Sequence, residues 1–408
     1  MNNRKFIIGI ILFSLTIAVY SQTAADFEVN GTVLVRYRGT ERDVNIPASL
    51  GITEIRSFAF SSSITRITIP ASVTTIGWGA FQVCKSLISI DVHNQNTAYS
   101  STDGVLFNKN KTILIQYPQG KQGQNYTIPA GVTTIEYGAF YNCTSLSSIN
   151  IPAGLTTIGT SAFSGCESLT SITIPARVTS IGDRAFSGCT RLTSITLPAG
   201  VTNIGNGAFS GCESLTSITI PARVTSIGSD AFYNCTSLSS ITIPASVISI
   251  GHGAFYGNSL TSINVHNQNT VYSSTDGVLF NRDKTILIKY PKGKQEQNYT
   301  IPGGVIEIGI NAFSGSYLTS ITIPAGVTTI EYGAFSESSL TTIIISAGVT
   351  SIGESAFGYC RSLTSITIPA SVTFVGEGAF HGCDALLPAV RADILRRFGE
   401  YVFENMYL

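Results

Sequence analysis

Apolar residues recur along this chain in one repeated pattern. In the unit formed by residues 168–190 they occupy Leu169, Ile172, Ile174, Val178, Ile181, Ala185, Phe186 and Cys189. The spacing Leu-x-x-Ile-x-Ile predicts a strand with one buried face, because alternate side chains of a strand point to opposite sides. Pro175 predicts the end of that strand, since proline cannot donate a ladder hydrogen bond. The next two apolar residues predict a second, shorter extended segment.

An Ala-Phe pair follows a turn in every unit, and we expect a short helical or 3-10 turn to carry it into the interior. The phenylalanines of these pairs are Phe60, Phe81, Phe140, Phe163, Phe186, Phe209, Phe232, Phe255, Phe313, Phe335, Phe357 and Phe380. Their spacing is 23 residues from Phe140 to Phe232, and 22 or 23 from Phe313 to Phe380. A unit this short cannot bury its apolar side chains alone, whereas stacked units can. The repeat therefore predicts a solenoid.

The units resemble the BspA-type leucine-rich repeats of bacterial surface proteins. The shared motifs are Leu-x-x-Ile-x-Ile-Pro, Val-x-x-Ile-Gly and Ala-Phe-x-x-Cys, and the resemblance covers about residues 44–386. It departs at Ser346, which replaces a strand-ending proline, and at Leu197, which replaces an isoleucine. The resemblance implies a mainly β, right-handed leucine-rich-repeat solenoid with a parallel sheet on the concave side and a C-terminal capping helix. It further implies adhesin-like binding of extracellular-matrix or other surface partners.

The first residues predict export from the cell. Arg4 and Lys5 precede an apolar run over residues 6–20, and small polar residues follow. The run is shorter than the ~20 residues of a membrane-spanning helix, so we interpret residues 1–21 as a signal peptide. An uncleaved anchor is the alternative. We expect a secreted or cell-surface protein without an integral membrane span after removal of the signal.

Charge gives no indication of a nucleic-acid partner. Removal of residues 1–21 takes away two basic residues and no acidic ones, so the formal charge changes from 0 to −2. Only 12% of the residues are charged, while 43% are hydrophobic. Phosphate backbones are bound by clustered positive charge, which this balance does not supply.

Two near-identical segments interrupt the repeat, at residues 92–127 and 265–300. Each contains Gly-Val-Leu-Phe, a polar turn and Thr-Ile-Leu-Ile-x-Tyr-Pro. The last motif aligns with the strand and proline of a unit, so we predict two long, irregular coils within a solenoid that spans residues 48–386. Their polar loops, such as residues 93–103, suit either ligand binding or a spacer role, and we favour the spacer.

The ends of the solenoid carry predicted caps. Residues 22–47 predict an N-terminal β cap, a hairpin with Asn30-Gly31 as its tight turn. Residues 387–408 predict a capping helix, because the apolar residues Val390, Ile394, Phe398 and Val402 recur every four positions. Such a helix would cover the apolar end of the stack.

The cysteines and histidines give no pattern of catalysis or metal binding. Cys143, Cys166, Cys189, Cys212 and Cys235 are 23 residues apart, and other units place Ser63, Asn258, Ser316 or Ser338 at the same position. Parallel side chains suit a disulfide poorly, so we predict a buried thiol ladder rather than disulfides. No paired Cys-x-x-Cys and no nucleophile motif accompanies the four histidines. We therefore expect no enzyme activity, no metal and no cofactor.

Small hydroxyl residues alternate with the buried isoleucines and predict an exposed face. We assign a binding role for proteins or glycans to eight of them: Ser171, Thr173, Ser194, Thr196, Ser217, Thr219, Ser240 and Thr242. Single hydrogen bonds are weak, so affinity would come from area and multivalency. Alternatively, such residues simply suit crowded strands. Ice binding is disfavoured by the expected curvature, and a structural envelope protein without a specific ligand is the alternative function.

Overall fold

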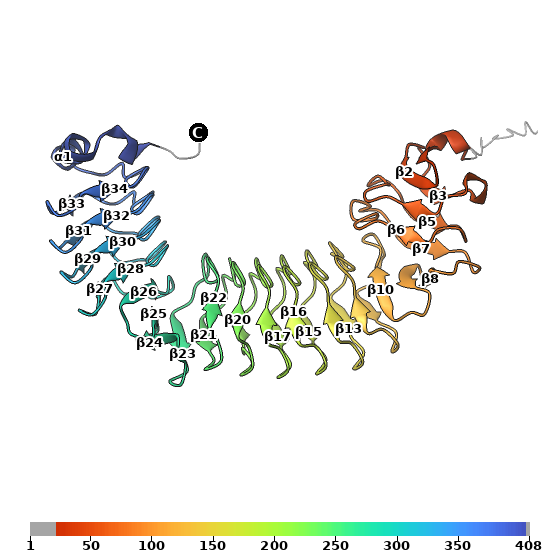
Figure 1. Ribbon diagram of the computed structural model, residues 1–408, viewed down its shortest axis with the longest axis horizontal. Coiled ribbons are helices and arrows are strands. Elements are labelled where there is room, and N and C mark those ends of the chain that lie inside the picture. The colour runs from red at the N-terminus through yellow and green to blue at the C-terminus, as the bar shows by residue number, and fades with distance from the viewer. Residues whose placement is uncertain (1–21, 405–408) are drawn as a thin grey trace, which may run out of the picture.

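Stacked coils form a long bow in this computed structural model, which describes residues 22–404 (Figure 1). Each regular coil contributes one short strand to each of two rows of parallel strands. Residues that are equivalent in neighbouring coils pair directly, as Ile172 does with Ile195 in one row and Ile181 with Ile204 in the other. The predicted mainly β solenoid is confirmed.

The first row contains the strands of the Leu-x-x-Ile-x-Ile motif. Ile172 and Ile174 are buried while Thr173 between them is exposed, so the strand presents one face to the core. The row consists of β3 (Asp43–Asn45), β5 (Arg66–Ile69), β7 (Ser89–Val92), β11 (Asn125–Thr127), β13 (Ser148–Asn150), β15 (Ser171–Thr173), β17 (Ser194–Thr196), β19 (Ser217–Ile218), β21 (Ser240–Ile243), β23 (Ser262–Val265), β27 (Asn298–Thr300), β29 (Ser320–Ile323), β31 (Thr342–Ile345) and β33 (Ser365–Thr367).

The second row follows the strand-ending proline in each coil. Val178 and Ile181 of a typical coil are fully buried. The row consists of β2 (Val33–Tyr37), β4 (Glu54–Ile55), β6 (Thr75–Ile76), β10 (Ile113–Gln116), β12 (Thr134–Ile135), β14 (Thr157–Ile158), β16 (Ser180–Ile181), β18 (Asn203–Ile204), β20 (Ser226–Ile227), β22 (Ser249–Ile250), β26 (Ile286–Lys289), β28 (Glu307–Ile308), β30 (Thr329–Ile330), β32 (Ser351–Ile352) and β34 (Phe374–Val375).

The Ala-Phe pairs enter the core from hydrogen-bonded turns. These are single turns closed by i→i+3 hydrogen bonds, such as that from the Ala185 amide to the Gly182 carbonyl at 3.2 Å, and not 3-10 helices. The described 3-10 helices are η1 (Ala24–Asp26), η2 (Ala48–Leu50) and η3 (Glu400–Phe403). The rings of Phe163, Phe186 and Phe209 stack with centroids 5.3 and 5.6 Å apart and planes within 7° of parallel. Each coil thus places its ring directly on the ring of the preceding coil.

Seven of the cysteines donate a hydrogen bond to a carbonyl of an earlier coil: Cys143, Cys166, Cys189, Cys212, Cys235, Cys360 and Cys383. The Cys189 thiol donates to the carbonyl oxygen of Phe163 at 3.2 Å, and the Cys212 thiol donates to that of Phe186 at the same distance. Burial raises the pKa of the Cys166 and Cys235 thiols to about 12. These contacts agree with the predicted thiol ladder, since each sulfur satisfies a buried carbonyl.

The two long segments are antiparallel meanders rather than irregular coils. In the first, β8 (Tyr99–Thr102) pairs with β9 (Val105–Asn108), and β9 pairs with β10. In the second, β24 (Tyr272–Thr275), β25 (Val278–Asn281) and β26 repeat this arrangement.

The alignment of Thr-Ile-Leu-Ile-x-Tyr-Pro with a first-row strand was wrong. β10 pairs in parallel with β12 and so belongs to the second row, whereas β11 pairs with β13 in the first row. The segment is followed by a proline, as the first-row strands are, so the motif alone pointed to the wrong row. Tyr117, which follows β10, takes the place of a phenylalanine and stacks on Phe140 at 5.3 Å.

The meanders divide the interior into three apolar cores. Val105 and Phe107 of β9 pack into the central core, while Leu106 between them packs into the N-terminal core. In β25, Leu279 packs into the central core, and Val278 and Phe280 pack into the C-terminal core. One strand with two buried faces therefore separates each pair of cores, and the bow bends at these two places (Figure 1).

Different structures close the two ends. At the N-terminal end β1 (Phe27–Asn30) forms an antiparallel hairpin with β2. Its turn residues are Gly31 and Thr32, one position later than predicted, because Asn30 pairs with Val33. At the C-terminal end α1 (Pro388–Phe398) stops before Gly399, so Val402 lies in η3 rather than in the helix. Ile394 and Val402 are both buried in the last core.

We expect the eight thiols of the folded chain to be unreactive toward Ellman's reagent, because all eight are buried. After unfolding in denaturant without reductant, all eight should react. Disulfides would be indicated by fewer than eight reactive thiols under these conditions.

Phe209→Ala should destabilise the fold by about 3–5 kcal/mol, since it removes a fully buried ring from the middle of a stack. The control is Phe374→Ser, because Phe374 is 56% exposed and pairs with Ser351 in the preceding coil. Chemical denaturation followed by circular dichroism measures both. Equal losses in the two variants would contradict the importance of ring stacking.

Candidate functional site

The eight hydroxyl residues selected from the sequence are all exposed, and we call this set the hydroxyl face. In its first three coils the backbone is in register, with Ser171 opposite Ser194 and Ser194 opposite Ser217. The sheet then breaks between β19 and β21, and Ser240 and Thr242 continue the two columns on the next sheet. The structure therefore brings the predicted residues together as two parallel columns.

The hydroxyls of this face have no hydrogen-bond partner within residues 22–404. A neighbouring column differs: the Thr193 hydroxyl donates to the carbonyl of Thr170 at 3.1 Å, and the Thr216 hydroxyl donates to that of Thr193 at 3.3 Å. The second row behaves likewise, since the Thr225 hydroxyl donates to the carbonyl of Thr202. The hydroxyls of Thr193, Thr216 and Thr225 thus donate to the stack, whereas those of the hydroxyl face are exposed and make no such bond among the described residues.

The hydroxyl face lies on the outer side of the bow, which corrects the predicted concave placement. Figure 1 draws β15, β17 and β21 toward the outer edge and β16, β20 and β22 toward the inner edge. The bow bends at the meanders. In the first, β8 and β9 extend the second-row sheet beyond β10. They also lie against β7 of the first row, where the Gly104 carbonyl accepts a hydrogen bond from the Ile90 amide.

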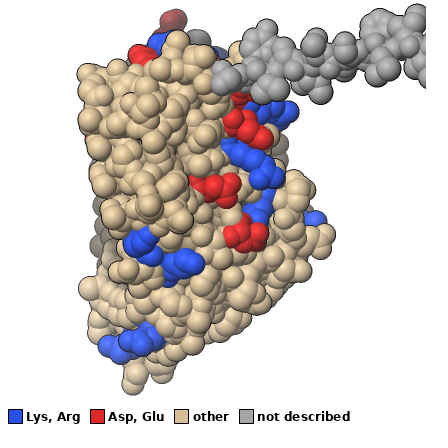
Figure 2. All heavy atoms as spheres, turned by 90° about the vertical axis from the view of Figure 1, so that its right-hand side faces the viewer, with Lys and Arg blue, Asp and Glu red and all other residues tan. Residues whose placement is uncertain are grey.

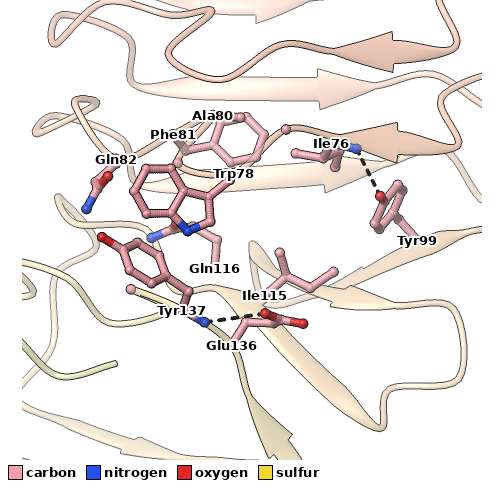
Figure 3. Close-up of a pocket in the computed structure, with 13 residues that line it drawn as sticks. Ile76, Trp78, Ala80, Phe81, Gln82, Tyr99, Ile115, Gln116, Glu136 and Tyr137 are labelled. Carbon is pink, nitrogen blue, oxygen red and sulfur yellow. Dashed lines mark hydrogen bonds between the residues drawn. The ribbon is translucent and has the colours of Figure 1, made fainter. Parts of the chain in front are cut away.

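Each bend encloses a pocket on the second-row side. At the first bend Trp78, from the turn after β6, contacts Tyr137, from the turn after β12, with ring centroids 4.2 Å apart. A cavity of about 310 Å³ lies beside these rings, and Tyr99 and Gln116 complete part of its wall (Figure 3). The segment after β10 lacks the protruding Ala-Phe turn, which leaves this space open.

The second bend repeats the pocket with different side chains. His252 takes the place of Trp78, Ile310 that of Tyr137 and Lys289 that of Gln116 around a cavity of about 320 Å³. Lys289 is 9% exposed, and its Nζ donates to the Asn311 carbonyl at 2.7 Å. Burial, together with the nearby Lys292, lowers the pKa of Lys289 to about 7.

The sequence interpretation did not identify these pockets. The available signals were the single tryptophan of the chain and the difference between Gln116 and Lys289, one of six differences between the two segments. Neither signal shows that Trp78 and Tyr137, which lie far apart in the sequence, meet across a bend.

The polar loops of the meanders are attached to the solenoid. Asn96 is fully buried, and its Nδ2 donates to the carbonyls of Pro70 and Val73 at 2.9 and 2.8 Å. Asn269 makes the equivalent bonds to Pro244 and Val247. Among residues 22–404, no group of three or more histidine, cysteine or acidic side chains is arranged to hold a metal ion.

We expect Lys289→Gln to make the free energy of unfolding depend less on pH. Between pH 7 and 10.5 the unfolded chain keeps the Lys289 proton and the folded chain has released it. Because the unfolded state binds more protons in this window, the free energy of unfolding rises with pH. Chemical denaturation from pH 7 to 9 should show a rise that is about 2 kcal/mol larger in the wild type than in the variant. Equal rises would contradict this assignment.

Comparison with known proteins gives a consistent family. The model of the BspA type leucine rich repeat region matches residues 40–122, 117–221, 202–296 and 284–408. A leucine-rich repeat protein from Eubacterium ventriosum has a similar structure, with 29% identity, a TM-score of 0.54, and coverage of 69% of this chain and 74% of the other. A leucine rich cell surface protein from Faecalibacterium prausnitzii shows 27% identity, a TM-score of 0.52, and coverage of 93% and 97%.

A search of curated proteins gives no match. The family model nevertheless matches the chain from residue 40 to residue 408, which includes the coils described above. The chain therefore belongs to the BspA-type leucine-rich repeat family.

Proposed function

We propose that this protein is secreted or held at the cell surface, where it acts as an adhesin-like scaffold that binds proteins or glycans through its hydroxyl face. The observation that carries the proposal is the difference between the threonine columns. The Thr193 and Thr216 hydroxyls donate to the stack, whereas the hydroxyls of Thr173, Thr196 and Thr219 have no hydrogen-bond partner within residues 22–404.

A repeated array suits a large, multivalent partner. Each coil offers the same two hydroxyls one strand spacing from the next, about 4.8 Å. A single neutral hydrogen bond contributes on the order of 1 kcal/mol, so useful affinity requires many bonds in parallel. Extracellular-matrix proteins and glycan chains offer repeated donors and acceptors of this kind.

The surface chemistry favours hydrogen bonding over charge attraction. Figure 2 shows the N-terminal end of the bow, where most of the surface is uncharged and the charged side chains of both signs occur in small groups. Such a surface provides little long-range steering, and its contacts depend weakly on salt.

The extracellular location has two supports. The similar protein from Faecalibacterium prausnitzii is described as a cell surface protein. The predicted signal peptide accounts for export, although residues 1–21 lie outside the described part of the chain. Within that described part, no helix has the length and apolar character needed to cross a membrane.

The scaffold is proposed to bind rather than to catalyse. The hydroxyl face consists of serine and threonine alone, and its columns contain no histidine or acidic residue that could activate a hydroxyl.

The triple variant Thr173→Asp, Thr196→Asp, Thr219→Asp should lose binding to extracellular-matrix proteins and glycans while it keeps its β-sheet circular dichroism, because the three side chains face water. The control variant places the same charges on the second row, at Thr179, Thr202 and Thr225, which are also exposed. It should bind like the wild type.

Surface plasmon resonance against a panel of such proteins and glycans measures all three proteins. Equal binding by both variants would place the contact elsewhere, and no binding by the wild type would favour a structural envelope role. Loss of circular dichroism in the first variant alone would overturn the assignment of Thr173 to the exposed face.

A further inference from the structure

The pocket at the first bend has an aromatic wall that the fold itself does not require. Trp78 is 55% exposed although it contacts Tyr137, so a large apolar ring faces solvent beside the cavity. Phe58, which is 47% exposed, meets Trp78 edge to face at 6.4 Å. Exposed aromatic side chains that are grouped in this way mark contact sites more often than isolated ones do.

The two central rings form a platform rather than a cage. Their centroids are 4.2 Å apart and their planes are tilted by 43°, so the rings pack against each other without forming one flat surface, and they leave no slot between them for a cationic group. A platform of this kind suits the C–H face of a sugar ring, whose weakly positive hydrogens are attracted to the negative face of an aromatic ring.

Polar groups surround the platform. The Gln116 Nε2 donates to the carbonyls of Tyr117 and Ala139, which leaves the Gln116 Oε1 as an acceptor without a donor among the described residues. Gln82 and Glu136 also line the pocket (Figure 3). Amide and carboxylate groups of this kind are suitable partners for the hydroxyls of a sugar.

The charge of the lining selects against anions. Glu136 is the one charged residue in the wall of this pocket, and no lysine or arginine lines it. An acidic ligand would meet this carboxylate without a compensating cation. The volume of about 310 Å³ is at the lower end of the ~300–1,000 Å³ range of small-molecule sites.

We propose that the first-bend pocket binds a neutral hexose unit of a glycan, with the sugar ring stacked on Trp78 and its hydroxyls bonded to Gln116, Glu136 and Gln82. This inference rests on the proposed extracellular binding role, since glycans are the partners available there. It adds a defined small site to the extended hydroxyl face, on the opposite side of the bow.

The second bend shows that the aromatic platform is not needed to build a bend. There the second meander is attached by an equivalent contact. The Tyr272 hydroxyl accepts a hydrogen bond from the Ile250 amide at 3.0 Å, as the Tyr99 hydroxyl does from the Ile76 amide in the first meander. His252 and Ile310 nevertheless occupy the places of the two central rings. A purely structural role for Trp78 and Tyr137 does not explain this difference.

The single tryptophan of the chain makes the test direct, because intrinsic tryptophan fluorescence reports on this pocket alone. The full-length protein is titrated with glucose, galactose, N-acetylglucosamine and their trisaccharides, and with choline and glucuronate as cationic and anionic probes. We expect a saturable change in emission with at least one neutral sugar. A hexose of this size has an expected dissociation constant on the order of 1 mM.

The matched variant replaces the platform with the residues of the second bend, Trp78→His together with Tyr137→Ile. The chain already holds these residues on the equivalent backbone, so we expect the variant to fold, with unchanged circular dichroism. Saturation-transfer NMR with the sugar that binds the wild type should show binding at least tenfold weaker.

Three results would overturn the proposal: no saturable response to any neutral sugar, a response to choline or glucuronate only, or undiminished sugar binding by the variant. The hydroxyl-face variant with three aspartates is the second control, and it should keep the fluorescence response. The two sites are thus tested separately. The aspartate variant changes the hydroxyl face and not the pocket, so it tests only the proposed matrix binding. The platform variant changes the pocket and not the hydroxyl face, so it tests only the proposed sugar binding.

Discussion

Direct stacking of equivalent side chains is the constraint on which this structure depends. A coil of 22 or 23 residues has too little interior to bury a phenylalanine, a cysteine and several aliphatic side chains, so each coil completes the core of its neighbours. The ring of Phe186 lies on that of Phe163, and the thiol of Cys189 satisfies the carbonyl of the same Phe163. Ring stacking, thiol bonds and strand pairing all require the same translation from one coil to the next.

Both candidate sites follow from this translation and from its interruption. Where it is uninterrupted, Ser171 and Thr173 recur in register, and a surface of identical hydroxyls results. Where a meander interrupts it, the stack turns, and turns that are distant in sequence approach each other. Trp78 and Tyr137 meet for this reason. The regular part therefore offers an extended surface, and each bend offers a pocket.

Much of the regular architecture could be predicted from one unit. The alternation around Ile172 gave the buried and exposed sides of the first row, and the 23-residue spacing of the cysteines indicated their buried ladder. The irregular parts were harder. The proline after Thr-Ile-Leu-Ile-x-Tyr resembles the end of a first-row strand, and only the pairing of β10 with β12 assigns the segment to the second row. Curvature was expected, but the hydroxyl face was placed on the wrong side of it, because the repeat itself does not indicate the bends at the two meanders. The helix ended four residues before Val402 because Gly399 follows it with a left-handed backbone, φ +92°.

Repetition also creates a hazard that the meanders reduce. Neighbouring coils are so alike that a chain shifted by one whole coil would still stack phenylalanine on phenylalanine, and such a misalignment costs little locally. β9 and β25 correspond to each other and to no other described strand. Each packs both faces into adjoining cores and pairs antiparallel with its neighbours. A chain that is misaligned by one coil cannot form the contacts of these two strands. The two meanders therefore fix the alignment of the repeated coils, and with it the number of coils between the bends.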